Sequence, residues 1–175
     1  MHTFDEPALF AALEKLPTAE RVAFAFAAAM RVQKLGHELQ SEACRTLLAN
    51  ARHAVAAYLL TAKFSAGEIA RLSSSLDELP ELDDDQVAAS AYMLRCVLTG
   101  EAKNALWAAR RAYDAADQRA QDEFEVEEFS PTVEKAILSS QVVQSELRAQ
   151  ANDLSLLQTN PHGIGLVCEQ YQLHV

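Results

Sequence analysis

The sequence predicts an all-α protein: a single-domain bundle of about seven mostly antiparallel helices with an irregular C-terminal tail. First, 32 of the 175 residues are Ala, and residues with a low helix cost outnumber those that favour strands. Second, apolar residues recur at helical spacing along most of the chain. Third, capping residues, Pro and Gly separate these periodic stretches. Because 175 residues fall within the usual size of one domain, we predict one helical domain over residues 1–175.

The N-terminal half is predicted to form four helices. Asp5 is a suitable cap for the first of them, and Pro17 ends it. The second carries the apolar run Val22–Met30, so we expect it to be buried on nearly all sides. Ser65 and Glu68 form a capping-box pattern before the fourth. These helices are expected over residues 6–16, 19–35, 38–62 and 66–78.

The C-terminal half is predicted to form three helices and a tail. Gly100 is typical of the left-handed residue that follows a helix, so one helix ends there and the next begins at once. Ser130 and Pro131 are a strong start signal, with Ser as the cap and Pro in the first turn. Residues 158–175 are interpreted as an extended or irregular tail. The three helices are expected over residues 84–99, 101–122 and 131–157.

The acidic residues are concentrated in two of the predicted connections. The chain has 25 Asp and Glu against 15 Lys and Arg, a formal net charge of -10. Residues 77–85 hold six acidic side chains and residues 122–128 hold five, with no Lys or Arg in either stretch. The remaining 14 acidic residues nearly balance the 15 basic ones, so the net negative charge of the protein is located in these two connections.

The two acidic connections are expected to lie at the same end of the bundle. One joins the predicted fourth and fifth helices and the other joins the sixth and seventh, and antiparallel packing brings such connections together. Two interpretations of these acidic connections stay open. The first, which we favour, is that they are solvated connections whose carboxylates suit the N-termini of the following helices. The second is that they form a binding site for a basic partner or a divalent cation. The candidate interaction patch consists of Asp77, Glu78, Glu81, Asp83, Asp84, Asp85, Asp122, Glu123, Glu125, Glu127 and Glu128.

Several classes of partner and location are disfavoured by the same composition. An acidic chain lacks the Lys and Arg that displace counterions from nucleic-acid phosphates, and it is repelled by anionic membranes. The N-terminus carries no signal-peptide pattern, and the longest apolar run is too short to span a bilayer. Three widely spaced cysteines, Cys44, Cys96 and Cys168, fit free thiols in a reducing cytoplasm. We therefore expect a cytoplasmic protein with no nucleic-acid or membrane partner.

No motif in the chain predicts catalysis or a cofactor. Glu-x-x-His, His-Glu-x-x-His, phosphate-binding glycine loops and the Gly-x-Ser-x-Gly elbow are all missing from the sequence. The aspartates of 83–85 lack the Gly that a calcium loop needs at its sixth position. We expect no catalytic residue, no metal and no cofactor.

Six segments of the chain form a recognisable pattern of helical junctions, none of them catalytic. They are Leu13–Leu16, Val22–Ala25, Phe64–Pro80, Leu98–Glu101, Ser130–Glu134 and Gly163–Gly165. This pattern resembles the YjaG-like family of uncharacterised bacterial proteins, and the similarity extends over about residues 9–165. The resemblance implies an all-helical fold and carries no established activity, although genome context suggests a signalling association for the family.

Two functions from different classes therefore remain, with a third possibility for assembly. We favour a non-enzymatic helical interaction or regulatory module that binds a partner with a basic surface through the acidic end. The alternative is a small-ligand-binding or enzymatic bundle with a site between helices, which predicts a pocket with converging ionisable groups. A homodimer is possible in either case, because helical bundles often pair through an exposed apolar stripe.

Overall fold

All the regular structure in the described part of the chain is helical. The computed structural model describes residues 1–35, 41–61, 65–124 and 130–171, and within these ranges it contains nine helices and no strand. The predicted all-α class is therefore confirmed, and the predicted count of about seven is too low. The helices are α1 (Glu6–Glu14), α2 (Thr18–Leu35), α3 (Glu42–Thr61), α4 (Ala66–Asp77), α5 (Asp85–Thr99), α6 (Ala102–Glu123), α7 (Pro131–Ser139), α8 (Gln141–Thr159) and α9 (Gly163–Gln170).

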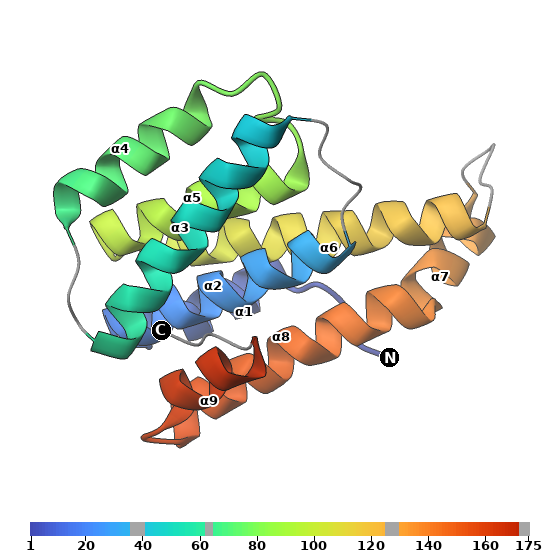
Figure 1. Cartoon of the computed structure of the whole chain (residues 1–175). Helices are drawn as coiled ribbons and strands as arrows, with labels where there is room; N and C mark the ends of the chain where they lie inside the picture. Colours follow the sequence, from blue (N-terminus) through green and yellow to red (C-terminus); the bar gives the residue numbers. More distant parts are fainter. Residues whose placement is uncertain (36–40, 62–64, 125–129, 172–175) are drawn as a thin grey trace.

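Helix α2 is the centre of the fold. It contacts α3, α5, α6, α8 and α9, and Figure 1 shows it between the α5–α6 pair and the α8–α9 pair. Every residue from Val22 to Met30 is buried, as the sequence predicts. Five of these nine residues are Ala, whose small side chains allow neighbouring helices to approach, while Phe24 and Phe26 fill the space between them. The apolar run thus positions both halves of the bundle.

Arg21 of α2 donates hydrogen bonds to the C-terminal ends of α1 and α5. Its Nε donates to the carbonyl of Leu13 at 3.0 Å and its Nη2 to that of Glu14 at 3.1 Å, both in the last turn of α1. Its Nη1 donates to the carbonyl of Gly100, the residue that ends α5, at 2.5 Å. A cation near helix C-termini satisfies carbonyls that have no partner inside the helix and suits the helix dipole.

The C-terminal region differs from the sequence prediction in two ways. The helix predicted over 131–157 is two helices, because Ser140 adopts an extended conformation and its hydroxyl caps α8 by accepting from the Val143 amide at 3.3 Å. The tail predicted to be irregular contains α9, whose Val167 and Cys168 are buried. Burial of this face against α2, α3 and α8 outweighs the low helix propensity of its glycines.

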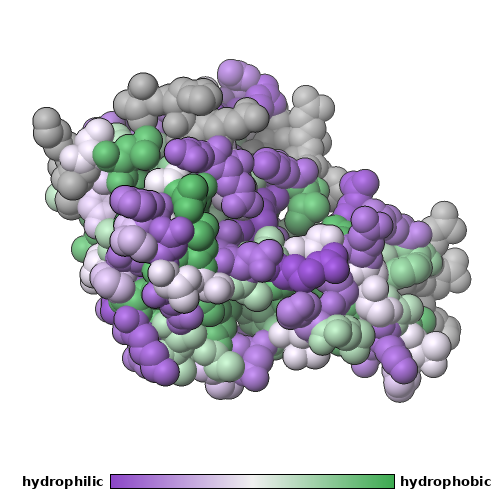
Figure 2. Space-filling view, turned by 90° about the horizontal axis from the view of Figure 1, so that it is seen from below, coloured by the Kyte–Doolittle hydropathy of each residue, from purple (hydrophilic) through white to green (hydrophobic). Residues whose placement is uncertain are grey.

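The exposed hydrophobic side chains are dispersed. Figure 2 shows the lower face of the molecule, where hydrophilic groups surround several small hydrophobic areas. None of the described helices has the length and apolar character that crossing a bilayer requires. The exposed large hydrophobic residues are Met1, Leu60, Leu82, Leu98, Phe124 and Leu166.

Replacing Gly100 with Ala should destabilise the protein by about 1–2 kcal/mol, the usual cost of a left-handed residue with a Cβ. Gly100 has φ of 69°, and a Cβ there would lie 3.2 Å from the Thr18 side chain. Gly165 of α9 is the control, because a Cβ there meets nothing within 4 Å. G165A should be neutral or slightly stabilising in urea unfolding followed by circular dichroism, and equal losses in both variants would contradict the account.

Candidate functional site

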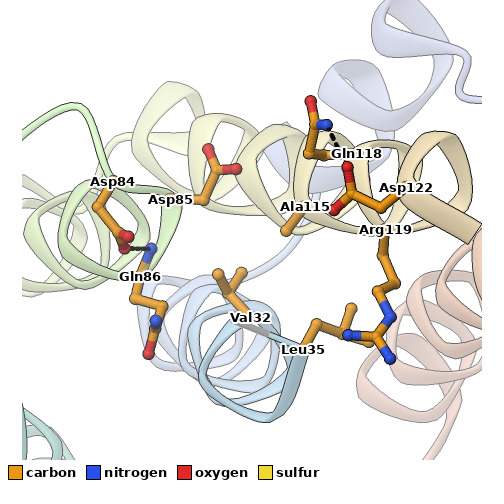
Figure 3. Close-up of a pocket in the computed structure, with 9 residues that line it drawn as sticks. All are labelled: Val32, Leu35, Asp84, Asp85, Gln86, Ala115, Gln118, Arg119 and Asp122. Carbon is orange, nitrogen blue, oxygen red and sulfur yellow. Dashed lines mark hydrogen bonds between the residues drawn. The ribbon is translucent and has the colours of Figure 1, made fainter. Parts of the chain in front are cut away.

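Three carboxylates from the two acidic connections line one pocket. Asp84 and Asp85 come from the start of α5 and Asp122 from the last turn of α6, while Val32 and Leu35 of α2 form the apolar side. Figure 3 shows these side chains around the opening between α2, α5 and α6. Residues from two segments that are distant in the sequence therefore meet at one place.

The pocket is small and strongly polar on one side. Its volume is about 60 Å³, enough for a few water molecules and well below the size of a typical metabolite site. The Asp84 carboxylate accepts a hydrogen bond from the backbone N–H of Gln86 at 2.8 Å and so caps the N-terminus of α5. Gln118 donates to Asp122 at 2.9 Å. This geometry suits contact with a partner's surface better than enclosure of a substrate.

Burial changes the electrostatics of the half-buried Asp85. Its pKa is raised mainly because its surroundings exclude water, and the bond from Arg111 at 3.2 Å opposes that change. On α3, the pKa of the Cys44 thiol is also raised, first by burial and then by the negative charges of Glu81 and Asp84. The acidic connection thus affects groups beyond its own segment.

The structure describes eight of the eleven residues of the predicted acidic patch. Three members, Glu125, Glu127 and Glu128, lie outside the described residues. The structure brings Asp84, Asp85 and Asp122 together at one pocket and does not place the other described members there. We name all eight described members the acidic face: Asp77, Glu78, Glu81, Asp83, Asp84, Asp85, Asp122 and Glu123. Three of the eight have an arginine partner, in the pairs Asp77–Arg95, Asp85–Arg111 and Glu123–Arg119.

A second charged group, which the sequence analysis did not identify, lies inside the protein. Arg31 of α2 donates through Nε to Glu146 of α8 at 2.8 Å and through Nη1 to Asp153 of the same helix. Its Nη1 also donates to the hydroxyl of Tyr171, just after α9, at 3.0 Å. The side chains of Arg31, Glu146 and Asp153 are 11%, 2% and 3% exposed. We name these four residues the Arg31 cluster.

Neighbouring residues extend this cluster in two directions. Gln150 donates to Glu146 at 2.8 Å and to the carbonyl of Ala109 in α6 at 3.0 Å. On the other side, the rings of Tyr171 and Phe26 pack in a T-shaped arrangement with 6.2 Å between centroids, and the Lys34 ammonium lies 5.0 Å from the centre of the Tyr171 ring. These contacts connect α8 to α6, and α2 to the end of α9.

The Arg31 cluster contains one more negative charge than positive charge. One guanidinium faces two carboxylates, and the Nη2 atom of Arg31 is buried without a hydrogen-bond partner in the described ranges. Burial alone would lower the pKa of Arg31, but Glu146 and Asp153 hold it above its usual value. Burial raises the pKa of Asp153, an effect that Arg31 reduces and Glu146 increases. Asp153 therefore binds a proton more readily than an exposed aspartate does.

The spacing of three polar residues on α8 is the sequence signal that could have revealed the Arg31 cluster. Glu146, Gln150 and Asp153 recur at intervals of four and three, so they share one face of a helix. Such a stripe usually faces water. A periodic pattern in one sequence does not distinguish a polar stripe that faces the protein interior from one that faces water.

The cysteines are buried and unreactive in character. Cys44, Cys96 and Cys168 are free and buried, in keeping with the predicted free thiols. Burial raises the pKa of Cys96 to about 12 and that of Cys168 to about 11. Among the described residues no group of three or more His, Cys, Asp or Glu side chains is arranged to hold a metal ion.

The comparisons with known proteins show a shared fold. No protein-family model matches the sequence, and no curated protein matches it. A crystal structure of a DUF416 family protein from Shewanella baltica OS155 superposes with a TM-score of 0.72 over 98% of this chain and 94% of that one. At 16% identity this likeness establishes the helical architecture of the two chains.

Arg31→Met should cost about 3–5 kcal/mol of unfolding free energy, because it leaves two buried carboxylates without their cation. Arg119→Met removes the exposed pair with Glu123 and should cost less than about 1 kcal/mol. Chemical denaturation of both variants gives the two values. The triple variant R31M/E146L/D153L should recover much of the loss, since no buried charge remains. A loss in R31M no larger than in R119M would show that the cluster contributes little.

Asp153 should give the protein a pH-dependent stability that Asp153→Asn lacks. The pKa of Asp153 is higher in the folded protein than its ordinary value of 3.8, so the folded state binds a proton more tightly than the unfolded state. The contribution is then fully present below 3.8 and is lost as the pH rises through the folded pKa. Unfolding measured from pH 3 to pH 7, about the range of ordinary carboxyl titration, should show wild type losing stability relative to D153N. The opposite slope would contradict this sign.

Proposed function

We propose that this chain is a helical interaction module that binds a protein partner with a basic surface through the acidic face. The observation that carries the proposal is the meeting of Asp84, Asp85 and Asp122 at one pocket. Carboxylates gathered from separate segments produce a stronger local potential than the same residues dispersed over the surface. A basic partner is steered to such a surface and held there by charge complementarity.

Unpaired exposed carboxylates support this proposal. Glu78, Asp83 and Asp122 are exposed, and none has a Lys, Arg or His partner within the described part of the chain. Carboxylates that already pair with an arginine would have to exchange that partner on binding. These three are free to accept charged donors from another molecule.

Each acidic connection also carries one exposed large hydrophobic side chain. Leu82 is 37% exposed and Phe124 is 51% exposed. Protein interfaces combine apolar anchors with a polar rim, and aromatic residues are frequent among the residues that contribute most binding energy. The acidic face thus offers both kinds of contact.

Three broader assignments belong to the same proposal. The segments described from the sequence support placement near the YjaG-like family, and with it a signalling association. The three free cysteines support a cytoplasmic location. The enzymatic alternative is weaker, since no described pocket unites a nucleophile, a base and an oxyanion donor.

A photo-crosslinking residue placed at Gln118, which lines the pocket and is exposed, should capture a partner in native lysate. The same residue at Ser155, exposed on α8, is the positional control. Capture from position 118 should disappear in 1 M salt, where the Debye length is only about 3 Å and the attraction between exposed charges is screened. Mass spectrometry of the adduct then identifies the partner, including a second copy of this chain.

A matched pair of charge variants decides whether the acidic face is responsible. E78Q/D83N/D122N neutralises these three unpaired carboxylates and leaves the arginine pairs of Asp77, Asp85 and Glu123 intact, so it should abolish capture without loss of stability. E68Q/E134Q/E169Q changes the net charge equally at exposed sites elsewhere and should leave capture unchanged. Equal effects of the two triple variants, or equal capture from both positions, would refute the proposal.

A further inference from the structure

A second pocket lies between the N-terminal arm, residues 2–5, and α8. Its volume is about 230 Å³, and its walls are mainly apolar, with Phe4 and Leu9 on one side and Leu147 and Leu154 on the other. Figure 1 shows the N-terminus beside α8. The pocket is separate from the acidic face and shares no residue with it.

The arm that forms one wall is fixed at both ends. The amide and carbonyl of His2 exchange hydrogen bonds with the Gln144 side chain at 2.8 and 2.9 Å. Phe4 stacks on Tyr113 of α6 with 5.0 Å between ring centroids, and Asp5 caps α1. A wall held by these contacts keeps its shape without a ligand, which lowers the entropy cost of binding.

Gln150 provides the polar group of this pocket. It is only 4% exposed, lines the pocket, and uses both hydrogens of its amide nitrogen on Ala109 and Glu146. Because both of those partners are acceptors, the orientation of the amide is fixed. Its Oε1 accepts no hydrogen bond from the described residues, so this oxygen can accept one from a bound molecule.

We propose that this pocket binds a small, mainly apolar molecule that carries one hydroxyl or amino group. The apolar body lies between Phe4, Leu9, Leu147 and Leu154, and its O–H or N–H donates to Oε1 of Gln150. A cavity of about 150 Å³ is sufficient for benzene, so this one holds an aromatic ring with a short side chain. A ligand without a donor would leave the amide oxygen buried and unsatisfied, which makes the donor the specificity element.

Three aromatic probes of nearly equal size test the site. 2-Phenylethanol and 2-phenylethylamine carry a donor, whereas the methyl ether of 2-phenylethanol does not. The protein is labelled at the Leu methyl groups. Both 2-phenylethanol and 2-phenylethylamine should then cause saturable changes in the methyl chemical shifts of Leu9, Leu147 and Leu154 in two-dimensional NMR. The ether should bind at least about threefold more weakly, the effect of one net hydrogen bond. Leu76, buried elsewhere in the core, is the reference signal and should not move.

A pair of neighbouring substitutions locates the binding. Ala151 lines the pocket and is exposed, so Ala151→Phe should fill the space and remove the shifts at Leu147 and Leu154. Asn152 is equally exposed on α8 but does not line the pocket, and Asn152→Phe should leave the affinity unchanged. Equal binding of ether and alcohol, unchanged shifts in A151F, or no saturable shift of the pocket methyl groups would overturn the proposal.

Discussion

The buried guanidinium of Arg31 is the interaction on which the arrangement of the C-terminal helices depends. Apolar packing brings α8 and α9 to α2 but allows many relative positions, whereas a buried charge is tolerated only where its partners meet it. Arg31 meets two carboxylates of α8 and the hydroxyl of Tyr171. Any other register of α8 on α2 would leave these charges buried and unpaired. The cluster therefore selects one packing, although replacing all of its charged residues by apolar ones should cost little stability.

The same network links regions that are distant in the sequence. Gln150 joins the Arg31 cluster to the carbonyl of Ala109 in α6 and also lines the pocket beneath the N-terminal arm. The pocket that Asp84, Asp85 and Asp122 line lies elsewhere, at the start of α5 and the end of α6. The charged pocket and the apolar pocket therefore have no lining residue in common. These two surfaces can act independently.

The sequence predicted the elements where local chemistry decides the outcome. The run Val22–Met30 could only be buried, and Gly100 and Ser130 mark helix ends through backbone preferences. The break at Ser140 and helix α9 depend on contacts between distant segments, which a periodic pattern does not contain. Burial of Arg31 was missed for the same reason, since the stripe of Glu146, Gln150 and Asp153 has the appearance of a solvated face. Charge counting, in contrast, located the acidic segments, because runs of like charge remain near the surface.

A double-mutant cycle between Arg31 and Glu146 tests the central claim most directly. The cycle compares wild type, R31M, E146Q and the double variant by equilibrium unfolding, and it isolates the coupling free energy of the pair. If Arg31 is the buried cation that fixes α8 on α2, the coupling should be favourable by about 2–3 kcal/mol, near the upper end for residues in one network. A coupling below about 0.5 kcal/mol, typical of independent sites, would contradict the account.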